Sequence, residues 1–406
     1  MKEVGTLIIG AGPAGFSAAV HLTKPGTIIL EKNSSPGKKL LISGSGQCNY
    51  THEGDISDFL NHYGDNAKFL KTALRSFTNR DLVEYFSQNG IQSVSDKNGK
   101  VFPASLNAND ILKLLLSVCR KNGVHVNTGC SVLGVEKNMH GFLIKTTNVE
   151  YLSKRLVIST GGLSYPATGS TGDGFHFAKQ LGHKIVQPKP ALSPVYIRDY
   201  RMAELSGVSL QDVEVYLYRN NKKIGEHKGD IGFTHKGLSG PGILDFSRHI
   251  ENNDILKINL IGVNEEDFRK VFIETSRQEG KQTLQLFFRK YAIPKSLMKV
   301  ILQQLNIEPE INLASVTKEM RNQLLNAFCG YPFFIEKVGG YKVAMTTSGG
   351  VSLNEINSRT MESKLVKNLF FAGEVMDIDG DTGGYNIQAA FSTGYLAAVT
   401  INSIID

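Results

Sequence analysis

A glycine-rich motif near the start of the chain has the spacing that lets a backbone approach a pyrophosphate. Residues 10–15 read G-A-G-P-A-G, the G-x-G-x-x-G pattern, and Glu31 lies 21 positions after Gly10. Gly10 would permit the tight turn, Gly12 would admit the pyrophosphate, and Gly15 would let a helix and a strand pack closely. Glu31 would accept hydrogen bonds from the ribose hydroxyls of an adenosine. The pattern therefore predicts a dinucleotide site.

The chain carries one copy of this motif, which favours FAD over NAD as the tightly bound cofactor. A separate Rossmann domain for NAD would bring a second copy, and the glycine-rich segment 159–174 does not follow the spacing. We therefore expect tightly bound FAD, with NAD(P)H as a transient co-substrate. In such an enzyme the flavin carries the redox chemistry, while the protein orients the substrate and tunes the ring.

Three further glycine-rich segments could complete a flavin site. The segment 37–49, GKKLLISGSGQCN, brings two lysines and a glycine loop that suit a phosphate and a flat ring. The segments 156–162 and 369–374 each run from apolar residues into glycine, as a strand that ends at a ligand would. After the second of these come Gly383, Gly384 and an alanine-rich helix. The dipole of that helix would stabilise negative charge on the reduced ring near N1 and the C2 carbonyl.

No spacing identifies the catalytic residues, because no Ser-His-Asp or paired-carboxylate arrangement is visible. His235 and Lys236 lie in the glycine-rich loop 233–242. A histidine there could protonate a substrate carbon or oxygen. Alternatively, it could be a loop or packing residue without a catalytic role. Tyr165 could donate a hydrogen bond to a substrate carbonyl, cover the flavin, or pack as an ordinary aromatic. For Cys48 we expect backbone contact with the flavin, because no basic neighbour that would activate the thiol is evident.

Hydrophobic periodicity predicts the elements that position these residues. Residues 4–9 and 27–30 are apolar and β-branched, which predicts two buried strands with a helix at 16–22 between them. Asp173 is expected to cap a helix over 175–181. The other expected elements are strands at 156–158, 208–218, 255–261 and 369–371, and helices within 265–305.

Composition narrows the class of protein. The chain has 406 residues, enough for two or three domains, and its 41 glycines carry no G-X-Y period, which excludes collagen. No segment reaches the roughly 20 apolar residues of a membrane helix, and we expect no signal peptide. The four cysteines form no C-x-x-C pair and no metal spacing. We therefore expect reduced thiols, no metal and a cytoplasmic protein.

The net charge of +7 is unevenly distributed along the chain. Residues 1–189 hold 21 basic and 13 acidic residues, residues 190–335 hold 19 and 17, and residues 336–406 hold 5 and 8. The excess forms no basic tail or dense stripe, so we expect a small-molecule substrate and neither a nucleic-acid nor a membrane partner. Scattered solvated lysines, or a mildly positive field for an anionic cofactor, would account for it.

Five motifs in a fixed order resemble one family. They are the N-terminal G-x-G-x-x-G, the GKKLLISGSGQCN run, STGGLSYPATGSTGDG at 159–174, FTHKGLSGP at 233–241 and FAGEVMDIDGDTGGYNIQ at 371–388. In these motifs, which span nearly the whole chain, the sequence resembles bacterial NAD(P)/FAD-dependent oxidoreductases of the aminoacetone-oxidase or BaiN type. The resemblance implies an α/β fold with a Rossmann-like, three-layer ββα FAD-binding domain built from residues 1–190 and 336–406. An insert at 191–335 would form a small β-barrel with a helical subdomain.

The resemblance also implies which residues contact the flavin. The implied contacts are Gly10, Gly12, Gly15, Glu31, Lys32, Lys39, Leu40, Cys48, Asn49, Thr160, Gly161, Gly373, Glu374, Asp377, Asn386 and Ile387. To the predicted cofactor site we add Pro13, Ala14, Gly44, Gly46, Val132, Gly162, Gly383 and Gly384. The family often has S-G-G-G-R-C-N where this chain has Ser45 and Gln47. That departure leaves open any role of an arginine there in binding a phosphate or an anionic substrate.

The predicted function is that of a FAD-dependent oxidoreductase. It would take hydride from NAD(P)H and pass it through flavin N5 to a small organic acceptor with an activated C=C, such as a steroid-like enone. Three alternatives stay open: a flavin amine oxidase that reoxidises with O₂, a flavin-dependent RNA-modifying or RNA-binding protein, and a flavin-binding sensor without turnover. A basic stripe would favour RNA, and the nearly balanced charge of the insert argues against one.

Overall fold

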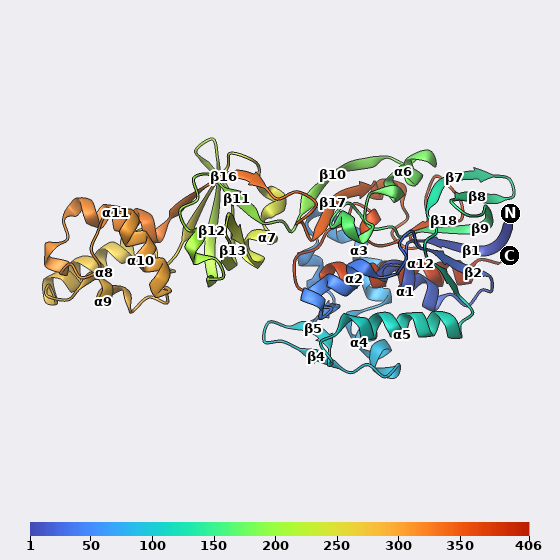
Figure 1. Cartoon of the computed structure of the whole chain (residues 1–406), viewed down its shortest axis with the longest axis horizontal. Coiled ribbons are helices and arrows are strands. Elements are labelled where there is room, and N and C mark those ends of the chain that lie inside the picture. The colour runs from blue at the N-terminus through green and yellow to red at the C-terminus, as the bar shows by residue number, and fades with distance from the viewer. Residues whose placement is uncertain (406) are drawn as a thin grey trace. The chain divides into compact units, whose positions relative to one another are not determined.

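The computed structural model describes residues 1–405 and divides into two compact units (Figure 1). Unit 1 comprises residues 1–191 together with the C-terminal segment that begins at Tyr341, and unit 2 comprises Leu192–Gly340. The boundaries expected from the sequence lie after residues 190 and 335, and a separate folding of the two units stays a prediction. Both ends of the chain therefore contribute to unit 1.

A largely parallel sheet forms the centre of unit 1. Its parallel strands follow the order β6-β2-β1-β9-β18, and β8 and β7 extend it beside the first half of β9 as antiparallel strands. Leu7, Ile29, Leu156 and Phe370 are fully buried, as expected for parallel strands covered on both faces. The strands are β1 (Lys2–Ile9), β2 (Thr27–Leu30), β6 (His125–Asn127), β7 (Val132–Asn138), β8 (Gly141–Thr146), β9 (Tyr151–Ile158) and β18 (Leu369–Phe371).

Two helices from opposite ends of the chain pack against each other in unit 1. They are α1 (Pro13–His21) and α12 (Tyr385–Ser403). They approach closely at Gly394, where a Cβ atom would lie 2.3 Å from the Ala14 carbonyl oxygen. The other elements of unit 1 are α2 (Lys38–Ile42), α3 (Ala67–Ser76), α4 (Asn79–Gln88), α5 (Ala108–Lys121), α6 (Asp173–Gln180), β3 (Thr51–His52), β4 (Ser93–Ser95), β5 (Lys100–Pro103), β10 (Ile185–Ala191) and β17 (Thr346–Val351).

Unit 2 is a closed six-stranded barrel with a group of helices inserted between its last two strands. The barrel order is β11-β14-β13-β12-β15-β16. Val213, Val215 and Leu217 alternate into its interior, as the period of a strand requires. The strands are β11 (Val195–Ile197), β12 (Ser209–Arg219), β13 (Lys222–Phe233), β14 (Gly237–Ser239), β15 (Ile255–Asn259) and β16 (Tyr331–Val338). The inserted helices are α8 (Glu265–Gln278), α9 (Leu284–Phe288), α10 (Lys295–Gln304) and α11 (Lys318–Cys329), and the short helix α7 (Pro241–Leu244) lies between β14 and β15.

This architecture confirms the predicted α/β fold with an inserted barrel and helices. The strands at 27–30 and 369–371 have the predicted bounds. The helix expected at 16–22 begins three residues earlier, at Pro13, because Gly12 already serves as its N-cap and proline suits the first turn. Within residues 1–405, we find no helix with the length and apolar character needed to span a membrane.

Candidate functional site

The predicted pyrophosphate loop joins β1 to α1. Gly10 has a φ of +103°, and a Cβ atom there would come within 2.6 Å of the Ser159 carbonyl oxygen. A Cβ atom on Gly15 would lie 2.0 Å from the Gly10 carbonyl oxygen, so the turn and the helix meet too closely for a side chain. By contrast, no atom lies within 4 Å of the Cβ position of Gly12, the N-cap of α1. The helix N-terminus is therefore open on the side where an anionic group would bind.

The Glu31 carboxylate is held beside this loop. Glu31 follows β2, is 8 % exposed, and accepts hydrogen bonds from the backbone N–H of Ala11 at Oε2 (3.1 Å) and of Asn33 at Oε1 (2.8 Å). Asn33 Nδ2 also donates to Oε1 (2.7 Å). The Cys130 N–H donates to the Glu31 carbonyl oxygen (2.9 Å), so Val132, at the start of β7, follows a loop that touches the end of β2.

Lys32 forms an ion pair that the sequence did not predict. Its Nζ lies 2.6 Å from Asp173 Oδ2 and also donates to the Thr171 hydroxyl. The expected capping role of Asp173 is wrong, because Gly172 is the N-cap of α6 and Asp173 is its first helical residue, without a side-chain capping bond. The Asp173 carboxylate instead neutralises the Lys32 ammonium.

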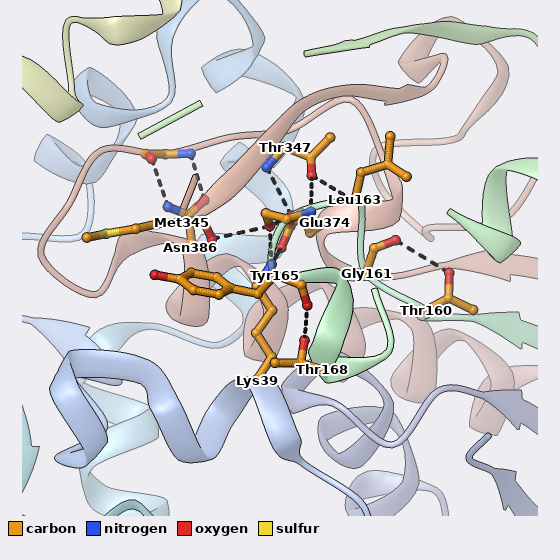
Figure 2. Close-up of polar contacts among 12 residues, drawn as sticks. Lys39, Thr160, Gly161, Leu163, Tyr165, Thr168, Met345, Thr347, Glu374 and Asn386 are labelled. Atoms are coloured by element: carbon orange, nitrogen blue, oxygen red, sulfur yellow. Dashed lines mark hydrogen bonds and ion pairs between the residues drawn. The ribbon is translucent and has the colours of Figure 1, made fainter. Parts of the chain in front are cut away.

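A second charged cluster joins segments from both ends of unit 1 (Figure 2). Lys39 Nζ lies 2.6 Å from Glu374 Oε2 and 2.5 Å from Ser164 Oγ. Glu374 Oε1 accepts from the Ser164 hydroxyl (2.9 Å) and from the Thr347 N–H (3.0 Å). A Cβ atom on Gly162 would meet Thr347 Oγ1 at 2.4 Å. Lys39 is therefore fixed in an ion pair and is not a lone cation for a phosphate.

The loop after α2 is built around a buried cysteine. Cys48 is fully buried with a φ of +61°, and its N–H donates to the Ser43 carbonyl oxygen (2.9 Å). Burial raises the pKa of the Cys48 thiol to about 12. The thiol is therefore protonated at neutral pH and is no resting nucleophile. Gly44 and Gly46 lie in the short helical turn before it, and Leu40 of α2 is buried.

The side-chain amide of Asn49 forms hydrogen bonds to the neighbouring backbone. Its Nδ2 donates to the carbonyl oxygens of Thr51 (2.8 Å) and Val101 (3.0 Å). A Cβ atom on Gly44 would come within 2.7 Å of the Asn49 backbone nitrogen. The Asn49 side chain therefore shapes the loop, and any contact it makes with a ligand would use Oδ1 or the backbone.

Predicted residues after β9 and β18 meet at one edge of the sheet. Thr160 and Gly161 follow β9, and Gly373 follows β18, its parallel neighbour. A Cβ atom on Gly373 would lie 2.8 Å from the Ala14 Cβ, and its N–H donates to Thr393 Oγ1 (3.0 Å). In open α/β sheets this carboxyl edge is where ligands bind.

A tight turn leads into α12. Gly384 is the N-cap of α12 with a φ of +100°, and a Cβ atom there would lie 2.5 Å from the Thr51 carbonyl oxygen, a space only glycine fits. Asn386 closes the turn from inside: Oδ1 accepts from the Gly380 N–H (2.8 Å) and Nδ2 donates to the Gly380 carbonyl oxygen (2.8 Å). Gly383 precedes this N-cap, so both predicted glycines lie in the turn.

The same region contains a small pocket and a perturbed carboxyl group. Burial raises the pKa of the Asp377 carboxyl, while hydrogen bonding from Asn66 and the Gly349 backbone opposes the shift. Ile387 packs partly buried against the core. The pocket is lined by Gly373, Glu374, Met376, Ile378, Asn386, Ala389 and Thr393. Three predicted contacts, Gly373, Glu374 and Asn386, therefore border one cavity.

The three catalytic candidates lie in different units. Tyr165 belongs to unit 1, where it has a φ of +51°; its N–H donates to the Tyr341 carbonyl oxygen (2.9 Å), and its own carbonyl accepts from Thr168 (Figure 2). His235 and Lys236 are exposed residues of the turn between β13 and β14 in unit 2. Within unit 1, Tyr165 is thus the only one of the three beside the predicted flavin residues.

An aromatic stack at the start of α12 escaped the sequence analysis. The Tyr385 ring lies between two imidazoles, with ring centroids 4.0 Å from His62 and 5.2 Å from His52, both nearly parallel. His62 Nδ1 lies 3.1 Å from Asp381 Oδ2, and the Asp381 N–H donates to the His62 carbonyl oxygen (2.9 Å). The side chains of His62 and Asp381 are 37 % and 24 % exposed. No spacing could have revealed this pair, because its members lie 319 positions apart.

Unit 1 fits FAD on the structure's own evidence. One glycine turn leaves the N-terminus of α1 open to an anion, Glu31 stands beside it, and a second glycine turn precedes α12. These features suit an anion, the hydroxyls of a ribose and the negative charge of a reduced ring, in that order.

Comparisons with known proteins agree with this geometry. The family model described as HI0933-like protein Rossmann domain matches residues 4–400. A protein from Haemophilus influenzae named ribosomal RNA dihydrouridine synthase is 31 % identical over 408 residues, 98 % of each chain. A protein of the same name from Escherichia coli is 30 % identical, again over 98 % of each chain. The 3-dehydro-bile acid delta(4,6)-reductase of Clostridium scindens is 28 % identical over 98 % of each chain.

Solved structures share the fold at low sequence identity. The 3-ketosteroid-delta4-(5alpha)-dehydrogenase of Rhodococcus jostii RHA1 aligns with a TM-score of 0.50 at 13 % identity, covering 99 % of this chain and 97 % of that one. A variant of FrdA from the Escherichia coli quinol fumarate reductase aligns with a TM-score of 0.51 at 14 % identity, covering 99 % and 70 %. At such identities the likeness concerns the fold alone.

Proposed function

The chain belongs to the HI0933-like family of FAD-binding Rossmann oxidoreductases, and from that premise we propose a reductase that acts on a C=C bond conjugated to a carbonyl, with NAD(P)H as donor. The names of its relatives support this chemistry. Dihydrouridine formation saturates the uracil C5–C6 bond, which is conjugated to the C4 carbonyl, and a 3-dehydro delta(4,6) compound is an extended enone. One reaction type therefore covers relatives with very different substrates.

The observation that carries the flavin part of the proposal is the pair of glycine-turn helix N-termini in unit 1, those of α1 and α12. The first suits the pyrophosphate, and the second favours negative charge on a reduced ring. When bound, FAD supplies hydride transfer between NAD(P)H and an organic acceptor. The protein itself binds the cofactor, orients the substrate and provides a proton.

We propose His62 of unit 1 as the proton donor. Saturating a conjugated C=C takes a hydride at one carbon and a proton at the other. Asp381 accepts from Nδ1 of His62, which fixes the ring orientation. Stacking on Tyr385 holds the ring plane. Nε2 of the protonated ring is then the atom that gives up the proton to the substrate carbon.

Anaerobic rapid mixing tests the proposal. NADH or NADPH should bleach the flavin band near 450 nm, and an enone such as cyclohex-2-enone, or unmodified ribosomal RNA, should restore it. The His62→Gln variant should keep the bleaching rate but restore the band at least 10-fold more slowly, with His52→Gln as the matched control on the other face of Tyr385. If neither nucleotide bleaches the flavin, the reductase assignment fails.

A uridine in RNA is a second, more specific substrate class. Two relatives of 31 % and 30 % identity, each aligned over 98 % of its length, carry the name ribosomal RNA dihydrouridine synthase. If this class is correct, unmodified ribosomal RNA should reoxidise the reduced enzyme and gain dihydrouridine detectable by mass spectrometry, while cyclohex-2-enone should react slowly. Rapid reoxidation by the enone alone would favour a steroid-like substrate.

A further inference from the structure

The helical part of unit 2 contains a segment with an uncompensated positive charge. Between residues 280 and 307 there are five basic residues and no acidic residue. Four of the five, Arg289, Lys290, Lys295 and Lys299, come from the loop after α9 and the first turns of α10. All four are exposed. We call them the α9–α10 cationic surface.

The helix α10 turns two of these charges to the same side. Lys295 and Lys299 are four residues apart, so their side chains are neighbours on one helix face. The opposite face is apolar, with Leu297 and Ile301 fully buried against the core of unit 2. Packing of that face therefore fixes the side of α10 from which both lysine side chains project.

Among the described residues, no cation of this surface forms an ion pair with a carboxylate, unlike those of the barrel. Burial lowers the pKa of Lys290 and outweighs the nearby charge of Glu279, which raises it. In the barrel, Arg219 pairs with Asp254 (2.8 Å), Lys223 with Glu226 (2.6 Å) and Lys228 with Asp212 (2.7 Å). Within residues 1–405, no ion pair involves any of the four residues of the α9–α10 cationic surface. This explains why unit 2 can be nearly neutral as a whole and still present a local positive field.

Aromatic side chains accompany these charges. The Lys290 ammonium lies 3.8 Å from the centre of the Phe287 ring and 5.4 Å from that of Tyr291. Such a contact holds the lysine stem while the charge stays exposed. Closely spaced, unpaired like charges repel each other, and a ligand with regularly spaced anions relieves that repulsion. A nucleic-acid backbone is such a ligand, and it releases counterions as it binds.

We propose that the α9–α10 cationic surface binds the phosphate backbone of RNA. The proposal rests on the RNA substrate class put forward above. It assigns the binding of that RNA to a surface of unit 2, outside unit 1. Contacts of this kind position an RNA without reading its sequence. They supply affinity that depends steeply on salt concentration.

Binding of a fluorescein-labelled 40-nucleotide RNA hairpin to the full-length, FAD-loaded protein tests the proposal. We expect K295E/K299E to weaken binding at least 10-fold at 100 mM KCl. We also expect the slope of log Kd against log salt to become shallower by about 1.5, because each lost phosphate contact removes roughly 0.7–0.9 from it. The matched control is K113E/K121E, which makes the same charge change at two exposed lysines of α5. It should bind as the parent does, and both variants should keep the parent's flavin absorbance.

The possible results separate this inference from the proposed function. If the parent binds the hairpin and K295E/K299E binds equally well with an unchanged slope, the surface assignment is wrong and the RNA substrate class stands. The assignment is also wrong if K113E/K121E loses as much affinity, because the effect is then one of net charge. If the parent does not bind RNA even at 25 mM KCl, the assignment of the surface and the assignment of RNA as substrate are both wrong. Reduction of an enone is tested separately by the rapid-mixing experiment. Binding to phosphatidylserine vesicles in place of RNA, lost in K295E/K299E, would overturn the proposal in favour of an acidic membrane.

Discussion

Gly12 and Gly15 belong to one motif, but their surroundings give them different roles. The Cβ position of Gly12 is open, whereas that of Gly15 collides with the Gly10 carbonyl oxygen at 2.0 Å. The second glycine is therefore required by the fold, whereas for the first we expect the requirement to come from the ligand. A sequence motif alone treats the two alike.

This difference predicts opposite outcomes for two substitutions. Gly12→Val should change the free energy of unfolding of the FAD-free protein by no more than about 1 kcal/mol, a helix-cap effect, yet weaken FAD binding at least 10-fold. Gly15→Ala should lower that free energy by about 1–3 kcal/mol through overpacking. Urea unfolding and FAD titration measure both quantities. Equal losses of stability in the two variants would contradict this assignment.

The buried cysteines give a second prediction at the scale of single residues. All four are free and buried, and burial raises the pKa of Cys48, Cys119 and Cys329 to about 12. Only the thiolate reacts, so at pH 8 these three thiols of the native protein should react with Ellman's reagent roughly a thousand-fold more slowly than free cysteine. In guanidinium chloride all four thiols should react. Fast labelling of one native thiol would show that a cysteine is open to solvent.

At the scale of elements, the crossing of α1 and α12 joins the two ends of the chain. A Cβ atom on Gly394 would lie 2.3 Å from the Ala14 carbonyl oxygen and 2.9 Å from the Ser17 Cβ. Small residues therefore let the two helix backbones approach, and this fixes the position of α12 against the first turns of α1.

Gly394→Val should separate these helices. We expect the free energy of unfolding to fall by about 1–3 kcal/mol and FAD affinity to fall with it, because the two glycine turns move apart. Val399→Ala is the control within α12, since Val399 is 42 % exposed and should matter little. Urea unfolding and flavin absorbance give the measurements, and an unchanged midpoint in Gly394→Val would refute the close packing.

At the scale of the whole molecule, unit 2 begins and ends at the same place. Its first strand, β11, pairs with its last, β16, through Val195 and Val338. The barrel is closed, and unit 2 has its own apolar core, which includes Phe268, Phe287 and Phe328 of its helices. An insert of this kind can be added to a host domain without opening the host's sheet.

A fragment of residues 192–340 should therefore fold alone. We expect a single cooperative urea transition and near-ultraviolet circular dichroism typical of packed aromatic rings. Because the chain has no tryptophan, the fluorescence of the tyrosines of the fragment gives an independent probe of the same transition. A fragment that unfolds without cooperativity would mean that unit 2 needs unit 1 for its stability.

Local patterns in the sequence determined much of this protein. The strands at 27–30 and 369–371, the glycine turn after β1 and the acidic residue after β2 all follow from apolar runs, glycine spacing and chain direction. These features depend on neighbours within a few residues, so a short stretch of sequence is enough to predict them.

Only the tertiary structure decided which distant side chains meet. Lys39 and Glu374 are 335 positions apart and His62 and Asp381 are 319, yet each pair is in contact. The strand β9 pairs with β1 on one side and with β18 on the other, which brings both chain ends to one edge of the sheet. The sequence predicted lysines without carboxylate partners and a capping Asp173. In the structure, Lys32 forms an ion pair with Asp173, and Lys39 forms one with Glu374. Strand order and helix crossing set such contacts, and no local spacing records either of them.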